Sequence, residues 1–183
     1  MKTLFTTLIS CSLLAAPTFA NNFDSQHRVG LGFSKTKINE YFTDSTVDWG
    51  KGIKLEYGYE FNRLVGLNVA YTKNKDSESN YGVSSDIDGF NIKIDADIGY
   101  KFYLENLNIK PYGLIGLAHH NEENSLSWDG GKLNETYKDT SIVIGLGARA
   151  EFGAHIYTDM RVDYAIYDDA DYDTFSWTIG YRF

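Results

Sequence analysis

The chain has 183 residues, a formal net charge of −8 and 15% aromatic residues, with 14 Tyr, 11 Phe and 17 Gly but only 2 Pro. This length fits one domain, and the abundance of aromatic residues and glycine favours an all-β protein over a helical one. The acidic balance makes the chain a poor candidate for binding nucleic acid.

Residues 1–20 have the organisation of a secretory signal. A cationic start precedes the mostly apolar segment Leu4–Ala16, and small residues follow at Thr18 and Ala20. This order predicts export and cleavage after Ala20, which leaves residues 21–183 as the mature domain. A lipoprotein cleavage box at Leu8–Cys11 is an alternative, but it leaves a very short apolar run. Cleavage after Ala20 removes Cys11, the single cysteine, so no disulfide is expected.

Strict alternation of apolar with small or polar residues recurs along the mature chain. It covers residues 28–34, 52–59, 65–72, 90–100, 142–152, 156–166 and 174–183. A period of two is the signature of a β-strand. An eighth segment, "PYGLIGLA" at 111–118, has strand composition but is apolar on both faces, so its faces stay unassigned. The sequence therefore predicts eight strands.

The connections between these segments alternate between long and short. Residues 38–49, 74–86, 119–139 and 168–173 form long, polar and acidic connections, whereas 60–64, 103–107 and 153–155 are short. Long outer loops and short periplasmic turns are typical of outer-membrane barrels. We expect an all-β, transmembrane, eight-stranded antiparallel up-and-down β-barrel in the outer membrane of a Gram-negative cell, with both termini periplasmic. A secreted antiparallel sandwich with one wet face is the alternative.

Charged residues and glycines occupy the polar face of the strands, which predicts a barrel with apolar residues outside. Eight strands leave an interior filled by side chains, and unpaired buried charges are costly. We therefore expect an interior charge network with a structural role rather than an ion path. Its members are Arg28, Lys54, Glu56, Lys93, Asp95, Asp97, Arg149, Glu151, Asp159, Arg161, Asp163 and Arg182.

The end of the chain, "GYRF" after the alternating "FSWTI", resembles the ends of small outer-membrane barrels. The resemblance implies that Tyr181 and Phe183 belong to a signal read by the barrel-assembly machinery, although Thr178 stands where the usual pattern has glycine. The mature chain is similar to the eight-stranded OmpX/Ail/OmpA-like group in length, strand number and ending. The resemblance implies adhesion, invasion, complement resistance or colonisation through exposed loops, as in an accessory colonisation factor.

Two connections carry candidate contacts with a partner. Trp128 lies in the longest connection, 119–139, and is either an anchor for a partner or a member of the outer aromatic girdle. Asp169, Asp171 and Asp173 form an acidic cluster of the kind that hard cations prefer, but the calcium-loop pattern is incomplete. We interpret the cluster as a solvated loop and leave open a bridge through divalent ions to lipopolysaccharide phosphates.

A lipid-modifying enzyme is a further class of function to weigh against surface interaction. Candidate groups for a lipid-modifying site cluster at one barrel rim: His119, His120, Glu122, Glu123, Ser125 and Ser127. Composition does not establish the geometry of a catalytic triad. The sequence has no phosphate loop, redox motif or metal-ligand spacing, so we expect no enzyme activity and no cofactor.

The expected function is surface interaction of the adhesion or colonisation type through acidic extracellular loops. A structural, envelope-stabilising barrel is the alternative. The expected partners are outer-membrane lipid, lipopolysaccharide, the barrel-assembly machinery and a host-surface ligand, with no nucleic acid.

Overall fold

The computed structural model describes residues 27–40, 46–80, 83–166 and 170–183. The strands are β1 (His27–Glu40), β2 (Thr46–Glu60), β3 (Val65–Asn80), β4 (Val83–Gly99), β5 (Phe102–Tyr103), β6 (Leu107–Trp128), β7 (Gly131–Phe152), β8 (Ile156–Ile166) and β9 (Ala170–Arg182). The predicted signal peptide lies outside the described residues. No helix among the described residues is long and apolar enough to cross a membrane.

The strands close into a barrel. Each long strand pairs in antiparallel fashion with its neighbours, and pairing of β4 with β6 and of β1 with β9 completes the ring. β5 has two residues and pairs only with β6, so eight long strands form the wall. Backbone hydrogen bonds of 3.0 and 2.9 Å between His27 and Phe183 fasten the seam. The expected eight-stranded up-and-down barrel is confirmed, and the sandwich alternative is wrong.

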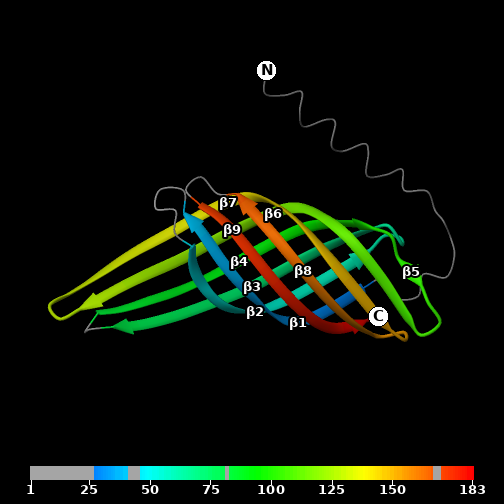
Figure 1. Ribbon diagram of the computed structural model, residues 1–183, viewed down its shortest axis with the longest axis horizontal. Helices are drawn as coiled ribbons and strands as arrows, with labels where there is room; N and C mark the ends of the chain where they lie inside the picture. Colours follow the sequence, from blue (N-terminus) through cyan, green and yellow to red (C-terminus); the bar gives the residue numbers. More distant parts are fainter. Residues whose placement is uncertain (1–26, 41–45, 81–82, 167–169) are drawn as a thin grey trace, which may run out of the picture.

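The barrel has two different ends (Figure 1). At the turn end lie the connections 61–64, 100–106 and 153–155, together with His27 and Phe183. At the hairpin end β1–β2, β3–β4, β6–β7 and β8–β9 are joined. In Figure 1 the β3–β4 and β6–β7 hairpins extend to the left, well beyond the other strands.

The strands at the hairpin end are longer than the sequence predicts. Most of residues 119–139, expected as a loop, belong to β6 and β7, which both have 22 residues and join through a tight turn at Asp129–Gly130. Gly130 supplies the positive φ of 112° that this turn requires. Similarly, most of 74–86 is strand in β3 and β4. Expecting loops here was wrong, because strands with water on both faces lack hydrophobic alternation.

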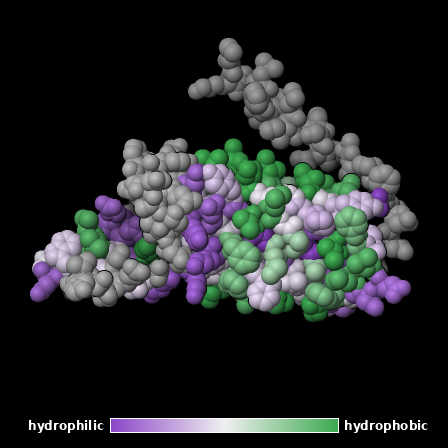
Figure 2. All heavy atoms as spheres, in the orientation of Figure 1, coloured by the Kyte–Doolittle hydropathy of each residue, from purple (hydrophilic) through white to green (hydrophobic). Residues whose placement is uncertain are grey.

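Apolar side chains cover the outside of the barrel wall. Leu31, Leu55, Ile115, Leu146 and Ile179 are more than half exposed, and their neighbours along each strand point into the lumen. Figure 2 shows hydrophobic residues spread over the body of the barrel and hydrophilic residues gathered on the hairpins. This distribution is the reverse of a water-soluble β-protein and suits a barrel surrounded by lipid.

The faces of the segment 111–118 are now assigned. Tyr112, Leu114 and Ala118 are buried in the lumen, where they form an apolar cluster with Val143 and Ala165. This apolar cluster therefore lines the side of the lumen formed by β6, β7 and β8.

Candidate functional site

The lumen is filled by ion pairs. Eight Lys or Arg and eight Asp or Glu side chains are buried among the described residues. The charged residues expected in the lumen from the sequence are all buried there: Arg28, Lys54, Glu56, Lys93, Asp95, Asp97, Arg149, Glu151, Asp159, Arg161, Asp163 and Arg182. Equal numbers of opposite charges in contact are the arrangement that limits the cost of burying ions.

Glu60 is the centre of the network near the turn end. Its carboxylate lies 2.9 Å from Arg28, 2.8 Å from Arg149, 2.5 Å from Lys101 and 4.0 Å from Lys110. Sequence reasoning missed Glu60, Lys101 and Lys110. Each of the three continues the inward alternation of its segment. However, Glu60 lies in a predicted turn, Lys101 lies beside one, and Lys110 precedes the segment 111–118, whose inward and outward faces the sequence did not assign.

Asp97 is a second acceptor beside Glu60. It takes a hydrogen bond from the Lys110 ammonium and lies 3.3 Å from Arg149 and 3.5 Å from Arg28. Asp159 adds an ion pair of 2.9 Å to Arg149 and accepts a hydrogen bond of 2.7 Å from a tyrosine hydroxyl in the lumen. The cations are therefore shared between acids from several strands, which fastens opposite walls of the barrel together.

A smaller network continues toward the hairpin end. Arg161 lies 3.0 Å from Asp95 and 3.2 Å from Asp163, and the Lys93 ammonium donates to Asp163 at 2.6 Å. Lys54 pairs with Glu56 at 2.5 Å. These ion pairs fill the middle of the lumen, which favours a structural role over an ion path.

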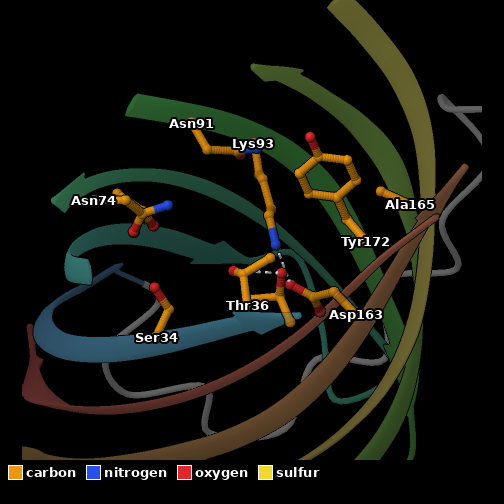
Figure 3. Close-up of a pocket in the computed structure, with 10 residues that line it drawn as sticks. Ser34, Thr36, Asn74, Asn91, Lys93, Asp163, Ala165 and Tyr172 are labelled. Carbon is orange, nitrogen blue, oxygen red and sulfur yellow. Dashed lines mark hydrogen bonds and ion pairs between the residues drawn. The ribbon is translucent and has the colours of Figure 1, made fainter. Parts of the chain in front are cut away.

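Above the Lys93–Asp163 pair, a polar cavity opens toward the hairpin end (Figure 3). It is lined by Ser34, Thr36, Thr72, Asn74, Asn91, Lys93, Asp163, Ala165, Tyr172 and Thr174. Thr36 and Thr174, paired on the adjacent strands β1 and β9, are hydrogen-bonded at 3.0 Å in its wall. The ion pair forms its floor, so the cavity is a shallow mouth.

The candidate groups for an enzyme fall on opposite faces of β6. His120 and Glu122 point inward and are hydrogen-bonded at 2.9 Å. His119 points outward and bonds the Thr140 hydroxyl at 2.8 Å. The alternation of the strand places Glu123, Ser125 and Ser127 on the outward side with His119. At ~3.4 Å per residue, Glu123 lies about 14 Å and Ser125 about 20 Å along the strand from His119, so these three side chains do not form a catalytic triad.

The β3–β4 and β6–β7 hairpins form a four-stranded blade that projects from the barrel. β4 pairs with β6 as far as Ser84 opposite Ser127, whereas β8 pairs with β7 only from Val143 onward. Among the described residues, residues 131–140 of β7 thus pair with β6 alone, over about 34 Å at ~3.4 Å per residue. On the other side, β3 pairs with β2 only as far as Lys75. Counting only the residues that the structure describes, the blade has two open edges.

An apolar patch lies near the tip of the blade, on the face continuous with the lumen. Leu126 lies directly opposite Leu133, and Trp128 is one step nearer the tip on the same face. Their exposed fractions are 40%, 50% and 45% respectively. The Trp128 ring covers Gly131, where an added Cβ would lie 2.7 Å from the ring. We call Leu126, Trp128 and Leu133 the tip patch; sequence reasoning missed Leu133.

Trp128 is far from the outer aromatic girdle. The last outward apolar residue of β6 before the blade is Leu117, eleven residues earlier. At ~3.4 Å per residue, Trp128 lies tens of ångströms farther along the strand. This position favours the anchor interpretation over the girdle.

Of the acidic cluster, Asp169 lies outside the described residues. Asp171 and Asp173 belong to β9, where Asp171 accepts a hydrogen bond from the Tyr164 hydroxyl and Asp173 lies opposite Lys37 of β1. Both aspartates therefore sit in paired strand, each beside a polar neighbour. Among the described residues, no group of three or more His, Cys, Asp or Glu side chains is placed to hold a metal ion.

Tyr181 and Phe183 lie at the turn end with their rings outward. The Phe183 ring stacks on His27 at 5.5 Å, and the Tyr181 ring stacks on His155 at 5.1 Å. The last strand is thus held by both neighbours up to its final residue.

A closed antiparallel barrel with a lipid-suited exterior and a charged, filled lumen defines the transmembrane β-barrel class. The sequence matches the family model "Outer membrane protein beta-barrel domain" over residues 6–183. The chain belongs to this family, and its place is the outer membrane of a Gram-negative cell. No curated protein matches the sequence.

Solved structures of outer-membrane proteins share the fold. Ail, the attachment invasion locus protein of Yersinia pestis, has a TM-score of 0.66 at 21% identity, covering 87% of this chain and 99% of that chain. The same values hold for Ail in complex with the heparin analogue sucrose octasulfate. The N-terminal barrel of Pseudomonas aeruginosa OprF gives 0.59 at 17%, covering 87% and 99%. Neisserial surface protein A gives 0.56 at 18%, covering 88% and 100%.

Proposed function

We propose that this chain is a surface-interaction protein of the adhesion or colonisation type, whose blade docks on a protein at a host surface. In outer-membrane barrels the longer connections face the outside of the cell, which puts the blade in the extracellular space. The observation that carries the proposal is the tip patch. Three large apolar side chains, each at least two-fifths exposed, stand on a projecting sheet surrounded by polar residues.

Exposed apolar groups rimmed by polar residues mark interaction sites, and Trp is enriched among the residues that dominate binding energy. The open edge of β7 adds a second means of attachment. Its edge-facing backbone groups can accept an extended strand from a partner, and backbone pairing of this kind supplies affinity in many peptide complexes. The blade therefore offers side-chain anchors and backbone groups on one projecting element.

Charge narrows the class of partner. Residues 119–139 contain four acidic side chains that are not buried in the lumen, Glu123, Asp129, Glu135 and Asp139, and two lysines. An acidic blade repels sulfated or phosphorylated polymers, so the partner differs in chemistry from the heparin analogue bound to Ail. A protein surface with an apolar pocket and a basic rim suits the tip patch best.

A structural, envelope-stabilising role is the second candidate, favoured by the dense ion pairs of the lumen. The other proposed partners are lipopolysaccharide around the barrel and the barrel-assembly machinery, which would read Tyr181 and Phe183. Cleavage of the signal peptide after Ala20 completes the proposed route to the outer membrane.

The test removes the tip patch and leaves the barrel intact. Cells expressing the Trp128→Ser, Leu133→Ser double variant are compared with wild type for binding to cultured epithelial cells. The matched control is Asn134→Ser, Thr136→Ser, which alters the opposite face of the same strand. We expect binding to fall at least about tenfold, since hot-spot residues contribute 2 kcal/mol or more. Unchanged binding with normal barrel levels refutes the adhesion proposal and favours the structural role.

A further inference from the structure

The polar cavity at the mouth of the lumen contains three neutral oxygen atoms that are buried without a hydrogen-bond partner among the described residues. These atoms are Ser34 Oγ, Asn74 Oδ1 and Asn91 Oδ1. Ser34 and Asn74 are each 2% exposed, so their side chains are enclosed within the barrel. Buried polar atoms in folded proteins nearly always have a partner, because an unpaired one has lost its hydrogen bonds to water. The three oxygens therefore call for a donor that the described part of the chain does not supply.

Gly52 holds two of these atoms at one place in the cavity wall. Its position in β2 is directly between Ser34 of β1 and Asn74 of β3. A Cβ built on Gly52 would collide with Asn74 Oδ1 and would lie 2.9 Å from Ser34 Oγ. A glycine lets other groups approach the backbone closely. The amide and the hydroxyl therefore share the space in front of Gly52, close enough to bind the same ligand.

The charge of the cavity limits the kind of ligand. Lys93 and Asp163, at its floor, form an ion pair of 2.6 Å and neutralise each other. The rest of the lining consists of hydroxyl and amide side chains together with Ala165 and Tyr172. A charged ligand would lose water here without gaining a counter-ion of its own, which is costly. An uncharged ligand with several hydroxyl groups suits the lining, because each hydroxyl both donates and accepts hydrogen bonds.

Tyr172 adds a flat aromatic surface to these polar groups. In Figure 3 its ring lies across the cavity from Ser34 and Asn74. The ring packs against the apolar cluster of the lumen and lies 5.4 Å from the ring of His120, and these contacts fix its orientation. The face of an aromatic ring packs against apolar groups, whereas amides and hydroxyls bind polar ones. A sugar ring has both kinds of surface, with C–H groups on its faces and hydroxyls at its edge.

We propose that the mouth of the lumen is a binding site for the terminal ring of an uncharged glycan, a neutral hexose at the end of the chain. The edge of the ring enters the shallow cavity, and its hydroxyls donate hydrogen bonds to Ser34, Asn74 and Asn91. One face of the ring rests on Tyr172. The site goes beyond the proposed docking of the blade on a protein and does not depend on the tip patch. It lies at the hairpin end, which a glycan reaches from outside the cell in the proposed orientation.

The test titrates folded, isotope-labelled protein with the methyl glycosides of galactose, glucose and mannose, in a zwitterionic detergent without a sugar headgroup. NMR signals of the Asn74 and Asn91 side-chain amides report on the cavity directly. The variant Ser34→Ala, Asn74→Leu removes two of the three oxygens with little change in volume. The matched control, Thr178→Val, removes a buried hydroxyl that also has no partner among the described residues but lies outside the cavity. A heat-dependent gel shift verifies that each protein is folded.

We expect at least one methyl glycoside to bind the wild type with a millimolar Kd, as is usual for a ligand of this size. The Kd should rise about tenfold in the Ser34→Ala, Asn74→Leu variant, the effect of losing two ordinary hydrogen bonds. It should change by less than about twofold in the control, because Thr178 does not line the cavity.

The arms of the experiment separate the possible failures. Unchanged amide signals with all three glycosides mean that the cavity holds water only, and they overturn the proposal. Equal affinity of the wild type and the Ser34→Ala, Asn74→Leu variant overturns the assigned site. Competition by acetate shows an anion site at Lys93 and overturns the uncharged class of ligand. The disaccharide that carries the bound sugar at its end, such as lactose for galactose, should bind at least as tightly as the methyl glycoside. Failure of the disaccharide to bind points to a free sugar and overturns the glycan end.

Discussion

Replacing Glu60 with Gln should destabilise the barrel strongly. The Glu60 carboxylate is 2% exposed and lies within 4.0 Å of four cations: Arg28, Arg149, Lys101 and Lys110. The amide keeps the shape of the side chain but removes its charge, so the cations lose an anion that several of them share. Removal of one partner from a buried ion pair costs about 3–5 kcal/mol, and we expect a loss of that size in the free energy of unfolding.

The measurement is reversible urea unfolding of the protein in lipid vesicles. Glu123→Gln makes the same chemical change at an exposed position of the blade, and it should stay within about 0.5 kcal/mol of wild type. Neutralising Lys101 together with Glu60 tests whether the two side chains depend on each other. Lys101 bridges Glu60 and Glu151, and Glu151 keeps an ion pair of 2.9 Å to Arg182 when Lys101 is neutral.

The Glu60→Gln, Lys101→Gln double variant should therefore lose less stability than the sum of the two single changes, by about 0.5–3 kcal/mol. Two results contradict this reasoning. One is a Glu60→Gln protein within about 1 kcal/mol of wild type, and the other is strict additivity of the two changes. Either result would show that the cations of the turn end do not depend on Glu60.

Three further predictions concern the wall and its seam. Because a closed barrel has no edge strand for detergent to enter, unboiled protein should migrate differently from boiled protein on gels, and identical migration contradicts closure. Leu55→Arg or Ile144→Arg should cost about 2–4 kcal/mol if these outward residues face the bilayer midplane, and Thr136→Arg on the blade should cost far less. Deleting Phe183 should reduce outer-membrane levels more than it reduces the stability of folded protein; normal levels contradict an assembly signal.

The sequence predicts the wall of the barrel well because alternation in a strand is a property of backbone geometry. Once a strand exists, each charged residue on the polar face must point into the lumen. Arg149 and Glu151 follow this rule within a segment that is apolar on its other side, and both are buried. The same rule reaches Glu60 and Lys110 only when the strand is known to extend to them.

The blade could not be predicted because its strands have water on both faces. Residues 121–128 and 131–138 show no hydrophobic period, although backbone hydrogen bonds continue between them. Pairing with β4 supports β6 there, and that contact is distant in sequence. Leu133 is recognised as part of the tip patch only because it lies opposite Leu126, and the sequence does not reveal this pairing.

The sequence also could not predict which lumen positions have room for a larger side chain. Gly58 looks like a permissive inward position where a Gly58→Ser change should be mild. In the structure, a Cβ at Gly58 would lie 2.4 Å from the Arg28 guanidinium, within the ion network of the turn end. The glycine makes room for Arg28, so the substitution should displace a buried cation. Small residues in the lumen are therefore set by the large side chains opposite them.

Charge is distributed over two zones with different physical constraints. The lumen is sealed by the barrel wall, so its ions must balance, and eight buried cations face eight buried anions. The chain as a whole has 17 Lys and Arg against 25 Asp and Glu, so its acidic excess lies outside the buried network. Solvent screens the part of that excess that lies on the exposed blade.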